Sequence, residues 1–250
     1  MNGFVELQRP DAAKLSGATA RAEVLRERYG ELEGEALLRV MLEWEYKGRI
    51  ALVSSFGAEA AVLLDMVARI DPATPVIFIN SGKLFHHTLT YRGILVRRLG
   101  LSDVRTIEPI PFDLAGHDPD GALWQRNPNL CCYLRKVLPL ERALGGFDAW
   151  ITGRKRDHGG ERGGLQTIEA VDGHIRFNPL AHWSPENIDD AFRERGLPRH
   201  PLSDEGYRSI GCVPCTEPAE ADAAARDGRW RGSAKSECGI HHPRWSPTHP

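Results

Sequence analysis

Short apolar runs alternate with helical patterns along the middle of the chain. Three runs rich in β-branched and other apolar residues, at 50–53, 76–79 and 104–107, predict strands. The segments between them, at 58–70 and 89–99, have the apolar spacing of helices. This alternation is typical of parallel βαβ units and predicts an α/β fold with a parallel sheet between helices.

The flanking segments extend this pattern. A further strand is predicted at 149–152, after a helix at about 131–144, and residues 20–46 indicate one or two amphipathic helices. The last part of the chain is rich in Ala, Gly, charged residues and finally Pro, with little periodic apolar content. We therefore expect a single domain over residues 1–215 and a flexible C-terminal tail over residues 216–250.

Three polar, glycine-containing loops follow predicted strands. In an open parallel sheet the ligand binds beyond the carboxyl ends of the strands, near the point where the strand order reverses. Hydroxyl groups, glycines and backbone N–H groups that open a helix suit a phosphate, so the loops together predict a nucleotide site. The first loop lacks the glycine and lysine pattern of the ordinary phosphate-binding loop. The loops consist of Ser54, Ser55, Phe56, Gly57 and Ala58; of Asn80, Ser81, Gly82 and Lys83; and of Thr152, Gly153, Arg154, Lys155 and Arg156.

Composition and charge exclude some classes of partner. The 250 residues carry 32 Lys and Arg against 34 Asp and Glu, a formal net charge of -2. This balance argues against nucleic-acid binding through phosphate neutralisation and provides no polybasic stripe for a membrane surface. The first ten residues contain no apolar signal region, and no apolar run approaches the roughly 18 residues of a membrane span. We therefore expect a cytoplasmic protein, and the sequence leaves a homo-oligomer open.

Five cysteines lie in a pattern typical of a metal centre. Thiols stay reduced in the cytoplasm, where they serve as ligands or nucleophiles rather than as disulfides. Cys131 and Cys132 are adjacent, and Cys212 and Cys215 form a Cys-x-x-Cys turn. The alternatives are two small buried side chains beside a redox pair, or a tetrahedral zinc site. Adjacent cysteines chelate one small ion awkwardly, whereas a cubane offers each sulfur its own iron, which favours a [4Fe-4S] cluster.

Two cations follow the adjacent cysteines by about one helical turn. Arg135 and Lys136 would lie close to the thiolates if this segment is helical. A cubane held by four thiolates is net negative, so a neighbouring cation offsets its charge and can hold an anionic substrate nearby. The alternative interpretation is ordinary solvated surface charge.

These motifs resemble the sulfonucleotide reductases, and among them the cluster-bearing assimilatory adenylyl-sulfate reductases. The matching sequences lie in the family's order and cover about residues 50 to 241. The paired cysteines and Glu-Cys-Gly-Ile-His at 237–241 are the most specific of them. The supporting sequences are Ser-Phe-Gly-Ala-Glu at 55–59, Ser-Gly-Lys at 81–83, Cys-Cys-Tyr-Leu-Arg-Lys-Val-Leu-Pro-Leu at 131–140, Thr-Gly-Arg-Lys-Arg-Asp at 152–157, Asn-Pro-Leu at 178–180 and Gly-Tyr-Arg-Ser-Ile-Gly-Cys-Val-Pro-Cys-Thr at 206–216.

The resemblance implies a fold, a cofactor and a reaction. The fold is the adenine-nucleotide hydrolase-like, Rossmann-like α/β sandwich. One [4Fe-4S] cluster per chain is held by Cys131, Cys132, Cys212 and Cys215. Cys238 is the nucleophile, which takes the sulfonate from adenylyl sulfate and expels AMP, and thioredoxin or a glutaredoxin-like reductant then releases sulfite. The reaction belongs to assimilatory sulfate reduction, which supplies cysteine biosynthesis.

The resemblance also implies a set of substrate contacts. The phosphosulfate lies among the three loops and Lys136, and two arginines of the tail reach it when the tail closes. His241 belongs to the motif of the nucleophile. The implied contacts are Ser54, Ser55, Phe56, Gly57, Ser81, Gly82, Lys83, Lys136, Arg154, Arg156, Arg226, Arg229 and His241.

The second loop departs from the family. Asn80 stands where the family usually has an aspartate, and His86 and His87 replace the usual Pro-Glu. We expect these histidines to be exposed and exclude them from the catalytic set. A neutral amide repels an extra phosphate less than a carboxylate does, so the 3'-phosphorylated nucleotide (PAPS) is the alternative substrate.

Two more distant hypotheses remain open. A cluster-bearing ATP pyrophosphatase of the tRNA-thiolation type shares the fold and four cysteines, but carries a Ser-Gly-Gly-x-Asp-Ser loop that this chain lacks. A non-enzymatic iron-sulfur sensor would leave Cys238 without a role.

Overall fold

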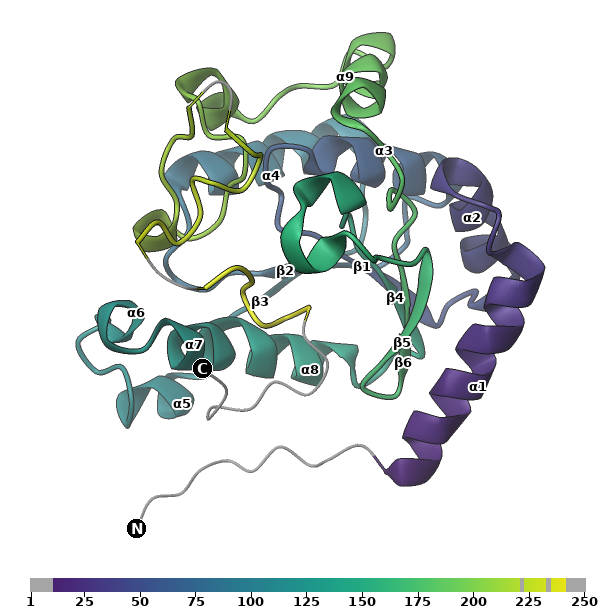
Figure 1. The fold of residues 1–250 in the computed structure, drawn as a ribbon, viewed down its shortest axis with the longest axis horizontal. Coiled ribbons are helices and arrows are strands. Elements are labelled where there is room, and N and C mark those ends of the chain that lie inside the picture. The colour runs from purple at the N-terminus through teal and green to yellow at the C-terminus, as the bar shows by residue number, and fades with distance from the viewer. Residues whose placement is uncertain (1–10, 221–222, 233–234, 242–250) are drawn as a thin grey trace.

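A six-stranded sheet forms the centre of the protein, which the computed structural model describes over residues 11–220, 223–232 and 235–241 (Figure 1). The strand order is β3-β2-β1-β4-β6-β5, and every neighbouring pair is parallel except the antiparallel hairpin of β5 and β6. The strands are β1 (Ile50–Val53), β2 (Val76–Ile79), β3 (Val104–Ile107), β4 (Ala149–Ile151), β5 (Ile168–Val171) and β6 (His174–Phe177).

Alternate side chains of the central strands enter two cores, because successive residues of a strand point to opposite faces. Leu52 and Phe78 lie in the larger core, whereas Ala51 and Ile77 lie in the core on the other face. Helix α8 (Leu138–Leu144) covers that second face, as Figure 1 shows. The larger core is built with α1 (Ala12–Tyr29), α2 (Gly34–Val40), α3 (Ala60–Ile70), α4 (His86–Leu99) and α9 (Pro185–Glu194).

One helical run carries the adjacent cysteines. It begins with α7 (Pro128–Cys132), continues through a π-helical turn (Tyr133–Val137) and ends as α8. Proline opens α7, and the Asn127 side chain accepts a hydrogen bond from the backbone N–H of Leu130 at 2.9 Å, which caps its first turn. Short helices precede it, α5 (Pro111–Ala115) and α6 (Leu123–Arg126), and 3₁₀ turns lie at Arg156–His158, Gly160–Arg162, Pro201–Glu205 and Val213–Cys215.

The predicted α/β sandwich is confirmed, with shifts at its boundaries. All four predicted strands are present, and the strand expected at 149–152 ends one residue earlier, at Ile151. The helix expected at 58–70 begins at Ala60, because Gly57–Glu59 belong to the preceding loop. The segment expected as one or two helices at 20–46 forms α1, α2 and a π-helical turn (Met41–Glu45), with α1 starting early because Asp11 caps it. The helices expected at 89–99 and 131–144 begin earlier, at His86 and Pro128.

The described part of the tail packs against the domain. The backbone N–H of Trp230 donates to the carbonyl of Cys215 at 3.2 Å, and the Trp230 side chain is buried. Ile240 contacts both apolar clusters on the α8 side of the sheet. Residues 221–222, 233–234 and 242–250 of the predicted tail, and residues 1–10 of the predicted domain, lie outside the described residues. The division into domain and flexible tail therefore stays a prediction.

Within the described ranges, no helix combines the length and the apolar character that a membrane crossing requires.

Candidate active site

The loops that follow β1 and β4 meet at the point where the strand order reverses. The chain runs from β1 through β2 to β3 on one side and then returns to place β4 on the other side of β1. Such a switch point leaves a crevice beyond the carboxyl ends of the two strands. A pocket lies there, lined by both loops, by α3 and by the tail. We call it the nucleotide pocket, after the site that the sequence predicts at these loops.

The loop after β1 is anchored by its aromatic residue. Phe56 is fully buried and meets Phe78 edge to face, with ring centroids 5.4 Å apart. Its φ of 50° lies in the left-handed region, and the Ser54 hydroxyl accepts a hydrogen bond from its backbone N–H at 3.2 Å. A Cβ on Gly57 would lie 3.2 Å from the Ser55 hydroxyl oxygen, a close contact that glycine avoids. The loop is therefore held in shape from beneath, with its polar side toward the pocket.

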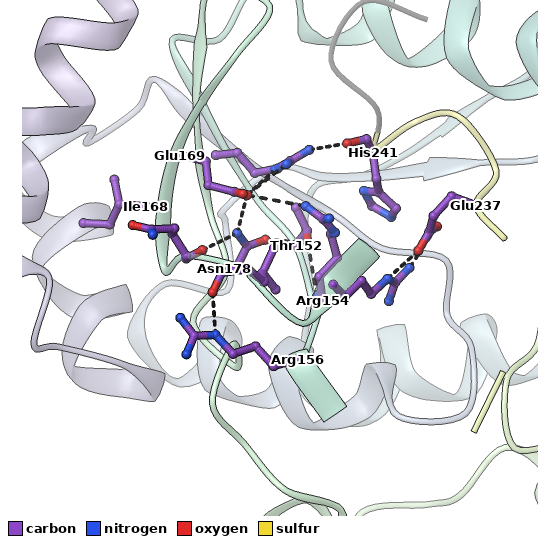
Figure 2. A network of polar contacts seen from close by, with 12 residues as sticks. Thr152, Arg154, Arg156, Ile168, Glu169, Asn178, Glu237 and His241 are labelled. Atoms are coloured by element: carbon purple, nitrogen blue, oxygen red, sulfur yellow. Dashed lines mark hydrogen bonds and ion pairs between the residues drawn. The ribbon is translucent and has the colours of Figure 1, made fainter. Parts of the chain in front are cut away.

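The loop after β4 is held by ion pairs between buried arginines and the partly buried carboxylate of Glu169. Figure 2 shows Glu169 of β5 at the centre of a network. Its Oε2 accepts from Arg176 Nε at 2.9 Å and Asn178 Nδ2 at 2.7 Å, and pairs with Arg154 Nη1 at 3.4 Å. Burial, reinforced by the charge of Arg176, lowers the pKa of Arg154 to about 10, which leaves it protonated at neutral pH. The β5–β6 hairpin thus fixes a positive charge beside the pocket.

The same network reaches the tail. Arg176 Nη1 donates to the carbonyl oxygen of His241 at 3.0 Å (Figure 2). The His241 ring lies parallel to that of Trp150, with centroids 6.4 Å apart. Burial, with Arg162 and Arg154 nearby, lowers the pKa of His241 well below its usual range, so the ring is neutral at pH 7. His241 therefore adds no positive charge to the pocket, although its neutral ring can still hydrogen-bond.

A smaller cavity brings the four paired cysteines together. Cys131, Cys132, Cys212 and Cys215 all line it, although the two pairs are about eighty residues apart in sequence. Burial raises the pKa of Cys131 to about 11 and that of Cys132 to about 12. Four cysteines around one cavity supply the kind of donor that an iron-sulfur cluster requires. Over the described ranges, no three His, Cys, Asp or Glu side chains are arranged to hold a single metal ion.

Lys136 lies between the cysteine cavity and the nucleotide pocket and lines both. It is half-buried, on the π-helical turn that follows the adjacent cysteines. Burial would lower its pKa, but Cys212, Cys238 and Cys132 outweigh that effect and raise it. π-Helical turns are common at functional sites. In this turn the adjacent residues Arg135 and Lys136 have different surroundings. Arg135 is instead buried against Asp118, its Nε donating to the carboxylate at 2.8 Å.

Ser81 contacts a cysteine and does not line the nucleotide pocket. It is fully buried, and its hydroxyl lies 3.1 Å from the Cys212 sulfur. Burial would raise the pKa of Cys212, but Lys136 and the Ser81 hydroxyl outweigh it and lower the pKa. The turn that carries Cys212 is tied to the same loop, because the backbone N–H of Val213 donates to the carbonyl of Lys83 at 2.8 Å. The loop after β2 therefore supports the cysteine cavity.

Two arginines of the tail line the nucleotide pocket together with Cys238. The guanidinium carbon of Arg229 lies 4.3 Å from the centroid of the Trp230 ring, and that of Arg226 lies 5.5 Å from it. Arg229 Nε also donates to the carbonyl of Cys215 at 3.2 Å. Cation–π contact with the indole thus helps to hold both arginines at the pocket that they line.

Most of the predicted substrate contacts come together in one pocket, and some lie elsewhere. Phe56 is beneath its loop, Gly82 and Arg156 are exposed, and Lys83 lines the cysteine cavity. Arg156 Nε donates to the carbonyl of Leu165 at 2.7 Å, so it supports its own loop. The predicted residues that line the nucleotide pocket are Ser54, Ser55, Gly57, Lys136, Arg154, Arg226, Arg229, Cys238 and His241.

The residues that depart from the family have other partners. Asn80 Nδ2 donates to Glu108 at 2.8 Å, and its side-chain oxygen accepts from the backbone N–H of Gly82 at 3.1 Å. His86 and His87 are exposed, as expected, and form the start of α4. Asn80 therefore stabilises its own loop.

The sequence did not identify the acid and base partners that organise the pocket. Lys155 is fully buried and donates to Glu59 at 2.9 Å, and Arg162 pairs with Glu237. Charged residues in glycine-rich loops were the only available signal, and that signal does not indicate which charges meet.

The comparisons with known proteins agree with this site. The model of the phosphoadenosine phosphosulfate reductase domain matches residues 49–218. The adenosine 5'-phosphosulfate reductase of Mesorhizobium japonicum is 47% identical over 225 residues, which cover 90% of this chain and 89% of that protein. The phosphoadenosine 5'-phosphosulfate reductase of Gloeobacter violaceus is 37% identical, covering 88% and 92%.

Among solved structures, the phosphoadenylyl-sulfate reductase of Candida auris in complex with phosphate superposes with a TM-score of 0.66 at 26% identity. The match covers 79% of this chain and 97% of that one. Family, fold and the crevice at the switch point thus agree, and the chain belongs to the phosphoadenosine phosphosulfate reductase family.

Proposed function

We propose that the protein reduces adenylyl sulfate to sulfite and AMP in assimilatory sulfate reduction, with thioredoxin or a related dithiol protein as the reductant. The observation that carries the proposal is the position of Cys238, which lines one pocket with the loops after β1 and β4 and with Lys136. A soft nucleophile therefore faces a set of cations and hydroxyl groups suited to a phosphate and a sulfonate. The name shared by the Mesorhizobium japonicum and other relatives supports the same substrate.

The chemistry divides into two displacements at sulfur. The Cys238 thiolate attacks the sulfonate sulfur, the bond from that sulfur to the phosphate oxygen breaks, and AMP leaves with the electron pair. A reductant thiolate then attacks the Cys238 sulfur, and sulfite leaves with the electron pair of the broken sulfur-sulfur bond. The second reductant thiol resolves the mixed disulfide and restores Cys238. The two electrons that form sulfite come from the dithiol.

Lys136, Arg154, Arg226 and Arg229 would supply the positive charge that this substrate needs. A cation beside the sulfonate lowers the cost of bringing a thiolate to it, and a cation on the phosphate stabilises AMP as it leaves. The hydroxyl groups of Ser54 and Ser55 would donate to the phosphate.

Cys131, Cys132, Cys212 and Cys215 would hold one [4Fe-4S] cluster. All four line a cavity that Lys136 also lines, and four thiols are a donor set that fits such a group. When bound, the cluster would supply a fixed negative charge that keeps Lys136 protonated and in place. Lys136 itself would bridge this charge and the sulfonate.

Residues 1–215 would form the nucleotide-binding domain, and residues 216–250 a tail that closes for the first displacement and opens for the second. Cys238 is only partly exposed and lines the pocket, so the second step would require it to move out to meet a reductant protein. The reaction would take place in the cytoplasm, where thiols stay reduced and dithiol reductants are present.

Adenylyl sulfate is preferred over its 3'-phosphorylated form in this proposal. Asn80 lacks the charge of an aspartate, but the exposed carboxylate of Glu108 accepts a hydrogen bond from it and keeps a negative charge at this loop. That charge would repel an additional phosphate.

A turnover assay tests the proposal. Anaerobically prepared protein with adenylyl sulfate, thioredoxin and a thioredoxin-reducing system should release sulfite and AMP in equal amounts, and Cys238→Ser should release neither. The value of kcat/KM for adenylyl sulfate should exceed that for the 3'-phosphorylated nucleotide at least tenfold. Equal values would overturn the substrate preference alone. Absence of sulfite with both nucleotides, or pyrophosphate release from ATP, would overturn the reaction itself.

A further inference from the structure

Glu237, the residue before Cys238, is buried and paired with the domain. Arg162 Nε lies 2.5 Å from Glu237 Oε1, and its Nη2 donates to Oε2 at 3.1 Å. Both side chains are less than a tenth exposed. This is the two-pronged geometry in which arginine binds a carboxylate most firmly. Arg226 of the tail approaches the same carboxylate at 3.3 Å.

Arg162 is itself held in place by a chain of polar contacts. Its Nη1 donates to His158 Nδ1 at 2.8 Å, and His158 Nε2 lies 3.3 Å from Glu59. Burial lowers the pKa of His158, so the ring is neutral at pH 7 and its Nε2–H donates to Glu59. Glu59 also accepts from Lys155 at 2.9 Å. The arginine that binds the tail is therefore anchored to the loops on both sides of the switch point.

We propose that Arg162 is a positioning residue whose paired contact with Glu237 holds Cys238 over the nucleotide pocket. This inference rests on the function proposed above, since it assigns the contact a place in the first displacement. Adjacent Cα atoms lie about 3.8 Å apart, so fixing the Glu237 carboxylate leaves the neighbouring sulfur little freedom. Gly239 follows with a φ of 85°, a conformation that lets the chain turn away directly after the nucleophile.

A charged contact suits a tail that must also open. A buried ion pair gains Coulomb energy but costs desolvation, and the two nearly cancel when both charges regain water on opening. The contact therefore fixes the geometry of the closed tail, while the closed and open positions differ little in free energy. An apolar anchor at the same point would hold the tail closed more firmly and slow the reductant's access. The contact is therefore expected to accelerate the first displacement and to leave the second unhindered.

Measuring the two displacements separately distinguishes this positioning role from a general structural role. In single turnover, adenylyl sulfate without reductant should load a sulfonate on Cys238 at least tenfold more slowly in Glu237→Gln and in Arg162→Gln than in the wild type. The double variant should be no slower than the singles, because all three lose the same contact. Discharge of the completed adduct by thioredoxin should stay within twofold. Glu217→Gln is the matched control, because Glu217 pairs with Arg231 in the exposed part of the tail at 3.4 Å.

Loading of Glu237→Gln at the wild-type rate would overturn the proposal, and so would an equal slowing of both half-reactions. Amide hydrogen exchange over residues 235–241 supplies a measurement independent of turnover. Exchange there should be at least fivefold faster in Glu237→Gln than in Glu217→Gln, and equal exchange would overturn the proposal. If the wild type forms no adduct at all, the proposed function has failed, and the exchange comparison still decides whether Arg162 holds the tail.

Discussion

Glu59 of the loop after β1 and Lys155 of the loop after β4 form an ion pair beside the nucleotide pocket. Because Lys155 is fully buried, each charge is stabilised by the other. Burial would raise the pKa of Glu59, but His158 and Lys155 outweigh it and lower the pKa to about 2. The ionised carboxylate is thus more stable in the folded chain than in the unfolded one.

Glu59→Gln should therefore destabilise the protein in a pH-dependent way. The contribution of Glu59 is complete above its ordinary pKa of 4.5 and is lost as the pH falls from there through about 2. We expect the variant to lose on the order of 3 kcal/mol at pH 7, since it leaves a buried ammonium without its counter-charge. The difference from the wild type should shrink at pH 3.

Urea unfolding at the two pH values measures this difference. The control is Asp190→Asn, which removes an exposed ion pair with Arg193 and should cost less than about 0.5 kcal/mol. A deficit of Glu59→Gln that is the same at both pH values would contradict the assignment of the shift to Glu59.

At the scale of single elements, the Cys-x-x-Cys turn joins parts of the fold that are otherwise separate. Its backbone bonds to the loop after β2, and its two cysteines line one cavity with Cys131 and Cys132 of the helical run that begins at Pro128. A ligand bound by all four cysteines would cross-link these elements, and such a link stabilises the folded state by its binding energy.

Cys215→Ser should therefore lose both iron and stability. The wild type should contain about four irons and four sulfides per chain. The variant should contain less than half of that, and its Tm should fall by more than about 5 °C. Iron and acid-labile sulfide analysis with thermal unfolding measures both, and Val213→Ala, in the exposed part of the same turn, serves as the control. Full iron content in Cys215→Ser, or stoichiometric zinc without sulfide in the wild type, would contradict the cluster.

The sequence predicted the elements whose pattern is local and not those that depend on distant partners. Strands β1, β2 and β4 are continuous apolar runs, whereas β3 also contains Arg105 and Thr106, and all four were predicted to within one residue. The β5–β6 hairpin was not predicted, although Asp172-Gly173 between its strands is a strong hairpin signal, with φ values of 49° and 80°. The contact of Arg162 with Glu237 joins residues 75 positions apart, and no local pattern encodes it.

At the scale of the whole molecule, the pocket is completed only when the tail lies on the domain. Arg226 and Arg229 reach it from the tail, whereas Ser54, Ser55 and Arg154 reach it from the domain. A bound phosphate would therefore attract both parts at once.

AMP should accordingly protect the tail from trypsin. Saturating AMP should slow cleavage after Arg226, Arg229 and Arg231 at least about fivefold, because cleavage requires the open state and the ligand favours the closed one. Mass spectrometry of timed digests measures the rates. Cleavage after the exposed Arg193 of α9 should not change. Equal rates with and without AMP would indicate that the nucleotide does not engage the tail.

The order of the site residues along the chain has a consequence for biosynthesis. The loops after β1 and β4 leave the ribosome well before Cys238 does, and the sheet that positions them can fold while translation continues. The domain's part of the pocket, with Ser54, Ser55 and Arg154, is therefore made before the proposed nucleophile. The proposed sulfur chemistry therefore cannot begin until the segment around Cys238 has been made and has docked on the domain.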